Sequence, residues 1–297
     1  MHSDPLPPTS RADASAPQLD LCFARGPRRN VYLSRQRASY PFHVGRLLDA
    51  PAGARVIVQS TSGGLFEHDE VAQHVVATHG ATARVETAAA TIVHSMTHGM
   101  ARACVRIEAL PGARLDWLPQ PSILFPSARL VSHIDAVLHP GARMLLMDSY
   151  MSHDPSGGQQ PFGALNASID VRSPAGRLLA RDSFRLAGAA QRPLGGVRGP
   201  FAVHGGLMVL TLDADERAAA LHALQRVAQQ TCYAGASLLP NGCGAFMRVL
   251  AVDGHKLRVA MKQAVDAVCA QTGDAFASKG SAPASTIPHI ARDKESA

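Results

Sequence analysis

The chain has 297 residues, of which 46% are hydrophobic, 18% charged and 5% aromatic, and its formal net charge at pH 7 is +6. This length supports a sizeable core, which must be built from aliphatic side chains. The sequence has no cluster of basic residues interleaved with aromatic ones and no run of about 18 apolar residues, so we expect neither nucleic-acid binding nor a membrane span.

The N-terminal segment is rich in proline. Its first 18 residues hold four prolines and lack the apolar core of a secretory signal. We therefore expect residues 1–18 to form a disordered leader. The five cysteines of the chain are scattered and include no Cys-x-x-Cys pair, which favours a reduced, cytoplasmic protein.

A short turn phrase then recurs along the chain. Its arginines are separated by 29, 30, 29 and 34 residues, a spacing typical of stacked supersecondary units. Proline presets the backbone for the second turn position and glycine accepts the positive φ that follows. The repeat predicts a pile of β-hairpin-sized units. Its copies are Gly53-Ala54-Arg55, the variant from Gly80 to Arg84, Pro111-Gly112-Ala113-Arg114, Pro140-Gly141-Ala142-Arg143 and Pro174-Ala175-Gly176-Arg177.

Strand patterns fill the chain between these turns. In residues 104–108, Cys104, Arg106 and Glu108 alternate with two aliphatic residues, as in a half-buried strand. The predicted strands are 55–58, 71–78, 83–93, 101–109, 115–125, 129–138, 143–150, 166–171 and 178–184, with a further one near 249–252.

The pattern changes after residue 190. Residues 191–206 and 235–244 are rich in glycine and are expected to be irregular. Apolar residues at helical spacing predict helices over 213–230 and 253–271, the first capped by Asp213 or Asp215. We expect one β-rich domain over 19–272 with this helical element near its end, followed by a flexible tail over 273–297.

Enzyme motifs are missing from the sequence. It contains no Gly-x-x-x-x-Gly-Lys-Ser/Thr phosphate loop, no His-Glu-x-x-His zinc motif and no Gly-x-Ser-x-Gly nucleophile. We therefore expect no nucleotide hydrolysis in this chain.

Two segments carry residues that bind metals. His94, Met96, His98 and Met100 occur at period two, so in a strand all four would share one face, and imidazole and thioether groups bind transition metals. The alternative is a lightly packed face near a loop. Residues 61–72 contain two glycines followed by Glu67, His68, Asp69 and Glu70, which fit either a carboxylate-lined cation site or an ordinary solvated turn.

Three further features suggest contacts with a partner protein. Trp117 stands in a stretch interrupted by two prolines, which fits either a core anchor or an edge strand used for docking. Leu257 and Met261 lie on the apolar stripe of the second predicted helix, which is expected to contribute to docking. Arg248 lies in the segment before that helix.

Five phrases in order resemble the UreD family of urease accessory proteins. The resemblance covers roughly residues 30–272, and it implies two packed sheets with a short helical part. The matching phrases are Ser62 to Val71, Glu86 to Thr91, Gly112 to Phe125, Pro140 to Asp148 and Phe246 to Ala251.

The resemblance also implies a function. It implies a protein without enzymatic activity, a scaffold or chaperone that helps to insert nickel into apo-urease. The implied complex contains UreF and also UreG, which supplies GTP hydrolysis. Nickel would pass in transit rather than stay as a tightly bound cofactor. The resemblance places Asp69, Thr87 and Asp148 on a polar nickel path, and the nearby His94 and His98 are added to it. Arg248 is then a candidate for partner contact.

The chain departs from the family pattern at several positions. Glu86 stands where the family has threonine, and Gln159 where it has an acid, which removes a charge that could guide a cation. Two other functions therefore stay open: a β-repeat binding module unrelated to urease, and a metal-binding protein that uses the His94/Met96/His98 face.

Overall fold

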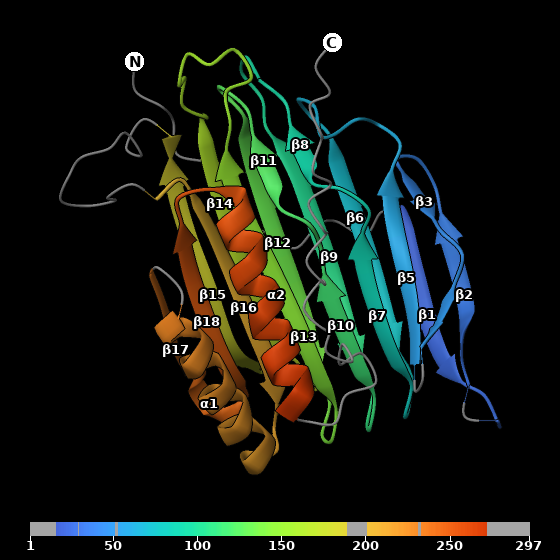
Figure 1. Cartoon of the computed structure of the whole chain (residues 1–297). Helices are drawn as coiled ribbons and strands as arrows, with labels where there is room; N and C mark the ends of the chain where they lie inside the picture. Colours follow the sequence, from blue (N-terminus) through green and yellow to red (C-terminus); the bar gives the residue numbers. More distant parts are fainter. Residues whose placement is uncertain (1–15, 29, 51–52, 189–200, 231–232, 272–297) are drawn as a thin grey trace, which may run out of the picture.

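The computed structural model describes residues 16–28, 30–50, 53–188, 201–230 and 233–271. Two mixed β-sheets face each other, and two helices cover part of one of them (Figure 1). The early strands are β1 (Leu19–Arg25), β2 (Val31–Ala38), β3 (Phe42–Val44), β4 (Leu48–Ala50), β5 (Gly53–Ser60), β6 (Glu70–Ala77), β7 (Thr82–Thr87), β8 (Thr91–Val93) and β9 (Ala101–Ala109). The later elements are β10 (Arg114–Leu118), β11 (Ser122–Leu124), β12 (Arg129–Leu138), β13 (Arg143–Ser152), β14 (Ala164–Arg172), β15 (Leu178–Ala187), β16 (Val203–Thr211), α1 (Ala214–Gln230), β17 (Tyr233–Leu238), the 3₁₀ turn η2 (Pro240–Gly242), β18 (Gly244–Ala251) and α2 (Gly254–Gln271).

The two sheets are built by a solenoid. Sheet A has seven strands in the order β15-β14-β12-β9-β6-β1-β2, and sheet B has 11, with the main path β17-β18-β16-β13-β10-β7-β5-β3. Each coil runs along sheet B, crosses to sheet A and returns: β5 to β6, β7 to β9, β10 to β12 and β13 to β14. Neighbouring coils pair in parallel in both sheets.

The predicted mainly β class with two packed sheets is confirmed, and the repeating unit is a coil rather than a hairpin. The turns at Gly80, Gly112 and Gly141 join strands that lie in different sheets, so their flanking strands do not pair with each other. The copy at Pro174–Arg177 does close an antiparallel hairpin, between β14 and β15. A Gly turn of this kind allows either connection, and the sequence pattern alone does not distinguish them.

The glycine turns stack on one another. Gly112 and Gly141 have φ of +72° and +71°, a conformation that favours glycine. A Cβ atom placed on Gly141 would lie 3.7 Å from the backbone nitrogen of Gly112, which shows how closely successive turns approach. One turn per coil thus sets the repeat that the arginine spacing revealed.

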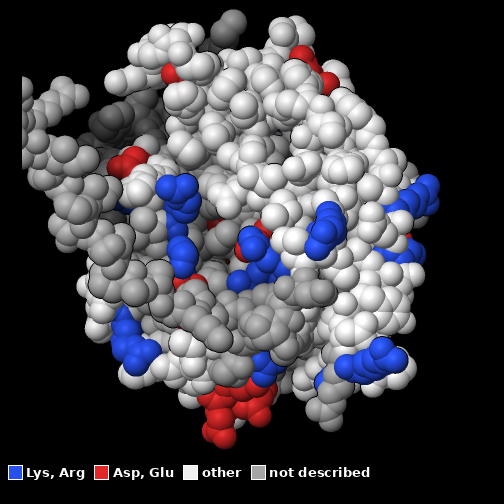
Figure 2. Space-filling view, turned by 45° about the vertical axis from the view of Figure 1, so that its right-hand side comes forward, with Lys and Arg blue, Asp and Glu red and all other residues white. Residues whose placement is uncertain are grey.

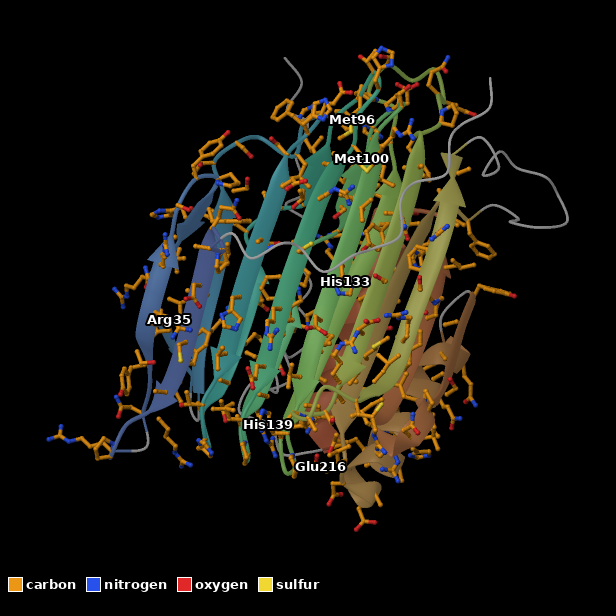
Figure 3. The ribbon with its side chains drawn as sticks, turned by 180° about the vertical axis from the view of Figure 1, so that it is seen from behind. Arg35, Met96, Met100, His133, His139 and Glu216 are labelled. Carbon is orange, nitrogen blue, oxygen red and sulfur yellow. The ribbon has the colours of Figure 1, made fainter. Side chains whose placement is uncertain are left out.

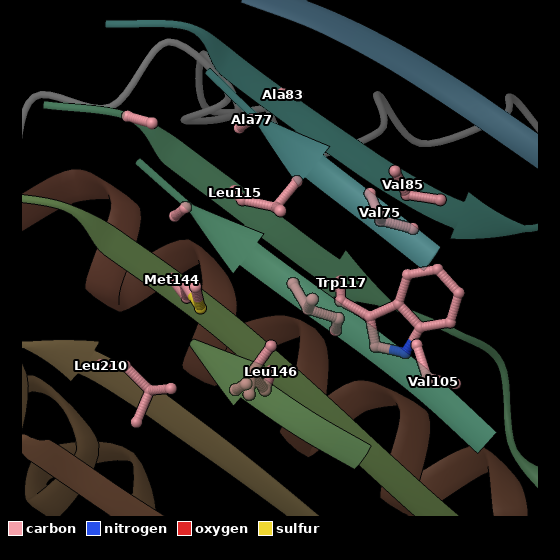
Figure 4. Close-up of a cluster of buried hydrophobic side chains, with 14 of the residues drawn as sticks. Val75, Ala77, Ala83, Val85, Val105, Leu115, Trp117, Met144, Leu146 and Leu210 are labelled. Atoms are coloured by element: carbon pink, nitrogen blue, oxygen red, sulfur yellow. The ribbon is translucent and has the colours of Figure 1, made fainter. Parts of the chain in front are cut away.

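Aliphatic side chains from both sheets fill most of the space between them. Figure 4 shows Val75 and Val105 of sheet A together with Val85, Leu115 and Trp117 of sheet B. Trp117 is 3% exposed and belongs to this core. The prediction that Trp117 contacts a partner is therefore wrong, because alternation along β10 points it inward while Asp116 and Leu118 point outward.

The two predicted helices pack on the outer face of sheet B (Figure 1). Asp213 caps α1, since its carboxylate accepts the Glu216 N–H at 2.8 Å. On α2, Leu257 and Met261 are 1% and 4% exposed because they face sheet B. The prediction that these two side chains dock a partner is wrong, since the sheet already covers the apolar stripe of α2.

Several strand boundaries differ from the predictions. The predicted strand 83–93 is split between β7 and β8, and 115–125 is split at Pro119 and Pro121, which lack the N–H needed for sheet pairing. Residues 203–206, expected to be irregular, begin β16. Positions 205 and 206 of this strand are glycine because Leu257 and the Asp148 carboxylate fill the space that larger side chains would take.

Most of the predicted leader and all of the predicted tail lie outside the described residues. Within the described part, both helices lack an apolar stretch long enough to cross a bilayer. The alternation predicted for residues 104–108 is observed, because Val105 and Ile107 are buried while Arg106 is exposed.

Truncating the apolar stripe of α2 should destabilise the whole fold. We expect Leu257→Ala to lower the free energy of unfolding by about 2–5 kcal/mol, because a fully buried leucine is lost from the contact with sheet B. The neighbouring Val259 is 40% exposed, so Val259→Ala should change it by less than about 0.5 kcal/mol. Urea unfolding followed by circular dichroism measures both. Equal stabilities of the two variants would contradict the packing described here.

Candidate functional site

A cavity of about 430 Å³ lies between the sheets, toward the end of the solenoid opposite the glycine turns. Its polar lining comes from both sheets, with Thr87, Asp148 and Tyr150 on sheet B and Gln73 and Ser132 on sheet A. Trp117 and aliphatic residues complete the wall. The cavity is therefore a mainly apolar chamber with a few inward polar groups, the usual composition of a site for a small solute.

Asp148 is the buried acid of this chamber. In β13, Met144 and Leu146 face the core between the sheets and Leu145 faces the helices, so alternation turns Asp148 inward. The residue is 4% exposed, and its Oδ1 atom has no hydrogen-bond partner. A Cβ atom on the paired Gly206 would lie 2.6 Å from Oδ1, so glycine at this position makes room for the carboxylate.

The surroundings of Asp148 favour its neutral form. Burial raises the pKa of Asp148 to about 7, while the charge of Arg248 acts in the opposite direction. Burial also raises the pKa of the neighbouring Tyr150, and the charge of Asp148 adds to that effect. The Asp148 carboxyl thus exchanges its proton near neutral pH, and as a carboxylate it offers an unpaired oxygen to a cation.

An ion-pair network lies beside the chamber. Arg248 pairs with Asp182 of sheet A and donates from Nη1 to His204 Nε2 at 2.6 Å. Its guanidinium lies 5.1 Å from the ring centre of Phe184 and 5.0 Å from that of Phe246. Arg248 is therefore held between the two sheets. The prediction that it contacts a partner stays a prediction, since the Arg248 side chain is paired with Asp182 and His204 but is 31% exposed.

His204 is buried in the neutral form. Burial, with a further contribution from the charge of Arg248, lowers the pKa of His204 to about 3. Because Nε2 accepts from Arg248, the ring proton sits on Nδ1, and this buried atom has no hydrogen-bond partner. The ring stacks on Tyr150 at a centroid distance of 5.7 Å.

A second cavity of about 440 Å³ adjoins the first. His204, Arg248 and Phe184 line it, and Tyr150 lines both cavities. Tyr150 and the Arg248 network therefore stand between the two chambers. They are the polar groups at the boundary of two mainly apolar cavities.

Thr87 links two irregular segments at the chamber wall, one after β7 and one after β10. Its hydroxyl donates to the Ala89 carbonyl at 3.1 Å and accepts the Gln120 N–H at 2.8 Å. These bonds hold the segments that follow β7 and β10, where the strands are interrupted. Of the five residues predicted for a nickel path, Thr87 and Asp148 are the two that line this cavity.

The other three predicted path residues lie in the loops at the same end of the molecule. Asp69 accepts the Phe66 N–H at 2.8 Å, and the His94 ring stacks on Phe66 at 4.3 Å. His94 also lies 3.2 Å from the carbonyl of Gly63, a cavity residue, which places it near the chamber wall. His98 is exposed.

The predicted histidine and methionine face does not form a strand. β8 ends at Val93, and the following residues form a loop in which Met96 is buried and His98 is exposed. Figure 3 shows Met96 and Met100 near this end of the solenoid, far from His139 at the other. In the part of the chain that the structure describes, no three His, Cys, Asp or Glu side chains are grouped as a metal site.

Glu67 organises this loop. Its carboxylate accepts the backbone N–H groups of Thr97 at 3.2 Å, His98 at 2.7 Å and Gly99. The three bonds lower the pKa of Glu67 to about 2. Glu67 therefore serves as a loop anchor, since most of its accepting capacity is already used.

The two departures from the family pattern lie away from the cavity lining. Glu86 pairs with Arg55 at 2.5 Å on the outer face of sheet B. Gln159 lies in the loop before β14, where the Asp154 carboxylate accepts the N–H groups of Ser156 and Gln160. Neither side chain is among those that line the chamber.

Sequence reasoning missed Tyr150, His204, Ser132 and Asp182. Tyr150 could have been predicted from the sequence, because the period-two pattern that places Met144 inward also places Tyr150 inward, two residues after Asp148. His204 was hidden by the following glycine pair, which suggested a loop. Ser132 and Asp182 come from strands of the opposite sheet, and only the tertiary structure brings them to this region.

Comparison with known proteins shows the family of the chain. The model of the family described as UreD urease accessory protein matches residues 15–280. The chain belongs to the UreD family of urease accessory proteins. It is 38% identical over 271 residues to urease accessory protein UreD 1 of Pseudomonas syringae pathovar syringae, covering 88% of this chain and 92% of that one. It is 38% identical over 261 residues to UreD 1 of Methylorubrum extorquens, covering 86% and 87%.

Membership of the UreD family fixes the general role. The chain is an accessory protein of urease rather than an enzyme, and it takes part in urease maturation. The resemblance stated from the sequence motifs is thereby confirmed.

The buried carboxyl should make stability depend on pH. The pKa of Asp148 is about 7 in the fold and near 3.8 in an unfolded chain. The folded state therefore keeps a proton that the unfolded chain has released, so stability falls as the pH rises from about 4 to 7. We expect Asp148→Asn to be more stable than the original chain at pH 8 by roughly 1–4 kcal/mol, and the gain should shrink toward pH 4.

Urea unfolding at pH 4, 6 and 8 measures this difference. The exposed Asp215→Asn serves as the control, and its stability relative to the original chain should not vary with pH. Parallel pH profiles for Asp148→Asn and the original chain would contradict a raised pKa for Asp148.

Proposed function

We propose that this UreD protein acts as a scaffold for nickel delivery into apo-urease, in complex with UreF and UreG. The observation that carries the proposal is the chamber between the sheets with the unpaired Asp148 Oδ1 atom on its wall. Nickel is here a cargo in transit. A carboxylate and imidazole groups suit such a cation, and a mainly apolar wall keeps its hold on the cation brief.

The proposed path begins at the loops that follow β5 and β8. Asp69, His94 and His98 lie there, and His94 approaches the chamber through the carbonyl of Gly63. Thr87 and Asp148 continue the path inside. The Arg248 network would end or gate the path, because its guanidinium charge repels a divalent cation.

UreF and UreG are proposed as partners because the chain lacks a phosphate-binding loop of its own. A GTP-hydrolysing partner would then supply the energy for delivery. We also propose a cytoplasmic location, since the described cysteines Cys22, Cys104 and Cys243 are free thiols, as expected in a reducing compartment. No nucleic acid or membrane takes part in the proposed assembly.

The decisive variant is Asp148→Asn, which keeps the shape of the side chain and removes the carboxylate. We expect it to lower the nickel content of urease matured in its presence by more than half, while pull-down of UreF and UreG stays unchanged. The measurement is metal analysis of purified urease, beside the pull-down. Asp215→Asn, an exposed acid in the first turn of α1, is the matched control and should mature urease normally.

Asp69→Ala tests the loop end of the path. Its carboxylate accepts the Phe66 N–H, so the variant is also expected to loosen this turn. Reduced nickel loading with intact pull-down would place Asp69 on the path. Unchanged loading in both Asp148→Asn and Asp69→Ala would refute the proposed path.

A further inference from the structure

The repeated turn phrase places four arginines on one surface. Arg55, Arg84, Arg114 and Arg143 alternate with inward residues of β5, β7, β10 and β13, so their side chains leave sheet B on its outer face. In the sheet register, Arg55 lies beside Arg84, and Arg114 lies beside Arg143. Between these two pairs the register is offset by two residues, because Arg84 lies beside Asp116 and Arg114 lies beside Thr82. The outer face of sheet B therefore carries two pairs of adjacent arginines, and Arg84 contacts Cys269 of α2.

Two of the four arginines have acidic partners. Arg55 pairs with Glu86 at 2.5 Å, and Arg84 pairs with the buried Asp116 at 2.6 Å. These pairs show that guanidinium groups on this face hold carboxylates.

The other two arginines, Arg114 and Arg143, lack such partners among the described residues. Among the described residues, neither the Arg114 nor the Arg143 side chain has an ion pair. Arg143 is 4% exposed, and both of its terminal nitrogens are without a hydrogen-bond partner. A buried guanidinium without a partner, beside a second one, is costly for the fold. An anion from outside the described chain would satisfy both groups.

We propose that Arg114 and Arg143 bind a carboxylate presented by an acidic segment of a partner protein. Arg114 is half-buried and lies at the surface, while Arg143 lies deeper and supplies two donors in a planar fork. Figure 2 shows Lys and Arg atoms in and around a hollow on this side of the molecule, with Asp and Glu atoms among them. The site lies on the outer face of sheet B and does not depend on the nickel path inside.

The position of α2 favours a carboxylate over phosphate. Cys269, near the C-terminal end of α2, lies 3.4 Å from Arg84 Nη2, so the negative end of the helix dipole faces this cluster. A singly charged carboxylate meets less repulsion there than a multiply charged phosphate. The acids already bound on this face, Glu86 and Asp116, are also carboxylates.

Binding of a labelled hexaglutamate peptide to the full-length protein tests the proposal. We expect Arg143→Met to weaken binding about tenfold, and Arg143→Lys to weaken it less, because lysine keeps the charge but loses the planar fork. Arg177→Met is the matched control, since Arg177 belongs to the same repeated phrase but lies in the exposed hairpin of sheet A. It should change the affinity less than about twofold.

The melting temperature of the free protein provides a second readout. Arg143→Met should raise it by about 2–4 °C, because the variant removes a buried charge that has no partner. A fall in melting temperature would show that Arg143 has an internal structural partner, and would overturn the proposal.

Two binding results would also overturn it. Equal weakening by Arg143→Met and Arg177→Met would reduce the effect to general surface charge. Binding of inorganic phosphate that displaces the peptide and is lost in Arg143→Met would assign the site to phosphate instead of carboxylate.

Discussion

In-register parallel stacking of the coils is the constraint on which the rest of this structure depends. Each strand of sheet B lies beside the equivalent strand of the next coil, so residues at equivalent positions form ladders across the sheet. Inward, the ladder of Val56, Val85, Trp117 and Leu146 forms the core. Such ladders are favourable for apolar groups, which bury area against one another, and unfavourable for like charges.

The outer face of sheet B neutralises only part of its arginine charge. The acids Glu86 and Asp116 occupy outward positions on neighbouring strands, where they neutralise Arg55 and Arg84. Arg114 and Arg143 lie beside each other and have no ion pair with a described residue, so positive charge remains on this part of the outer face. The same rule of alternation that places Trp117 in the core thus creates the basic surface behind it.

The polar chamber arises where the coils lose their regular shape. Strands β7 and β10 are both interrupted near this end, and the Thr87 hydroxyl bridges the two interruptions. There the inward ladder changes from aliphatic residues to Thr87, Asp148 and Tyr150. Gly206 on the adjacent strand leaves space for the carboxylate. A buried acid is tolerated because its raised pKa lets it carry a proton near neutral pH.

The sequence by itself determined the β class, the repeat, both helices and the family, because turn glycines, alternation and helical spacing are local patterns. The family resemblance also predicted a path through Thr87 and Asp148, which line the chamber, and through Asp69, His94 and His98, which do not. Only the tertiary structure decided that the repeats are coils, since the same glycine turn serves a hairpin or a crossover. It also decided that Trp117, Leu257 and Met261 are core residues rather than docking residues, because burial depends on which surface covers an apolar stripe. The meeting of Tyr150 with His204, and of Arg114 with Arg143, follows from pairing between distant strands, which no local pattern encodes.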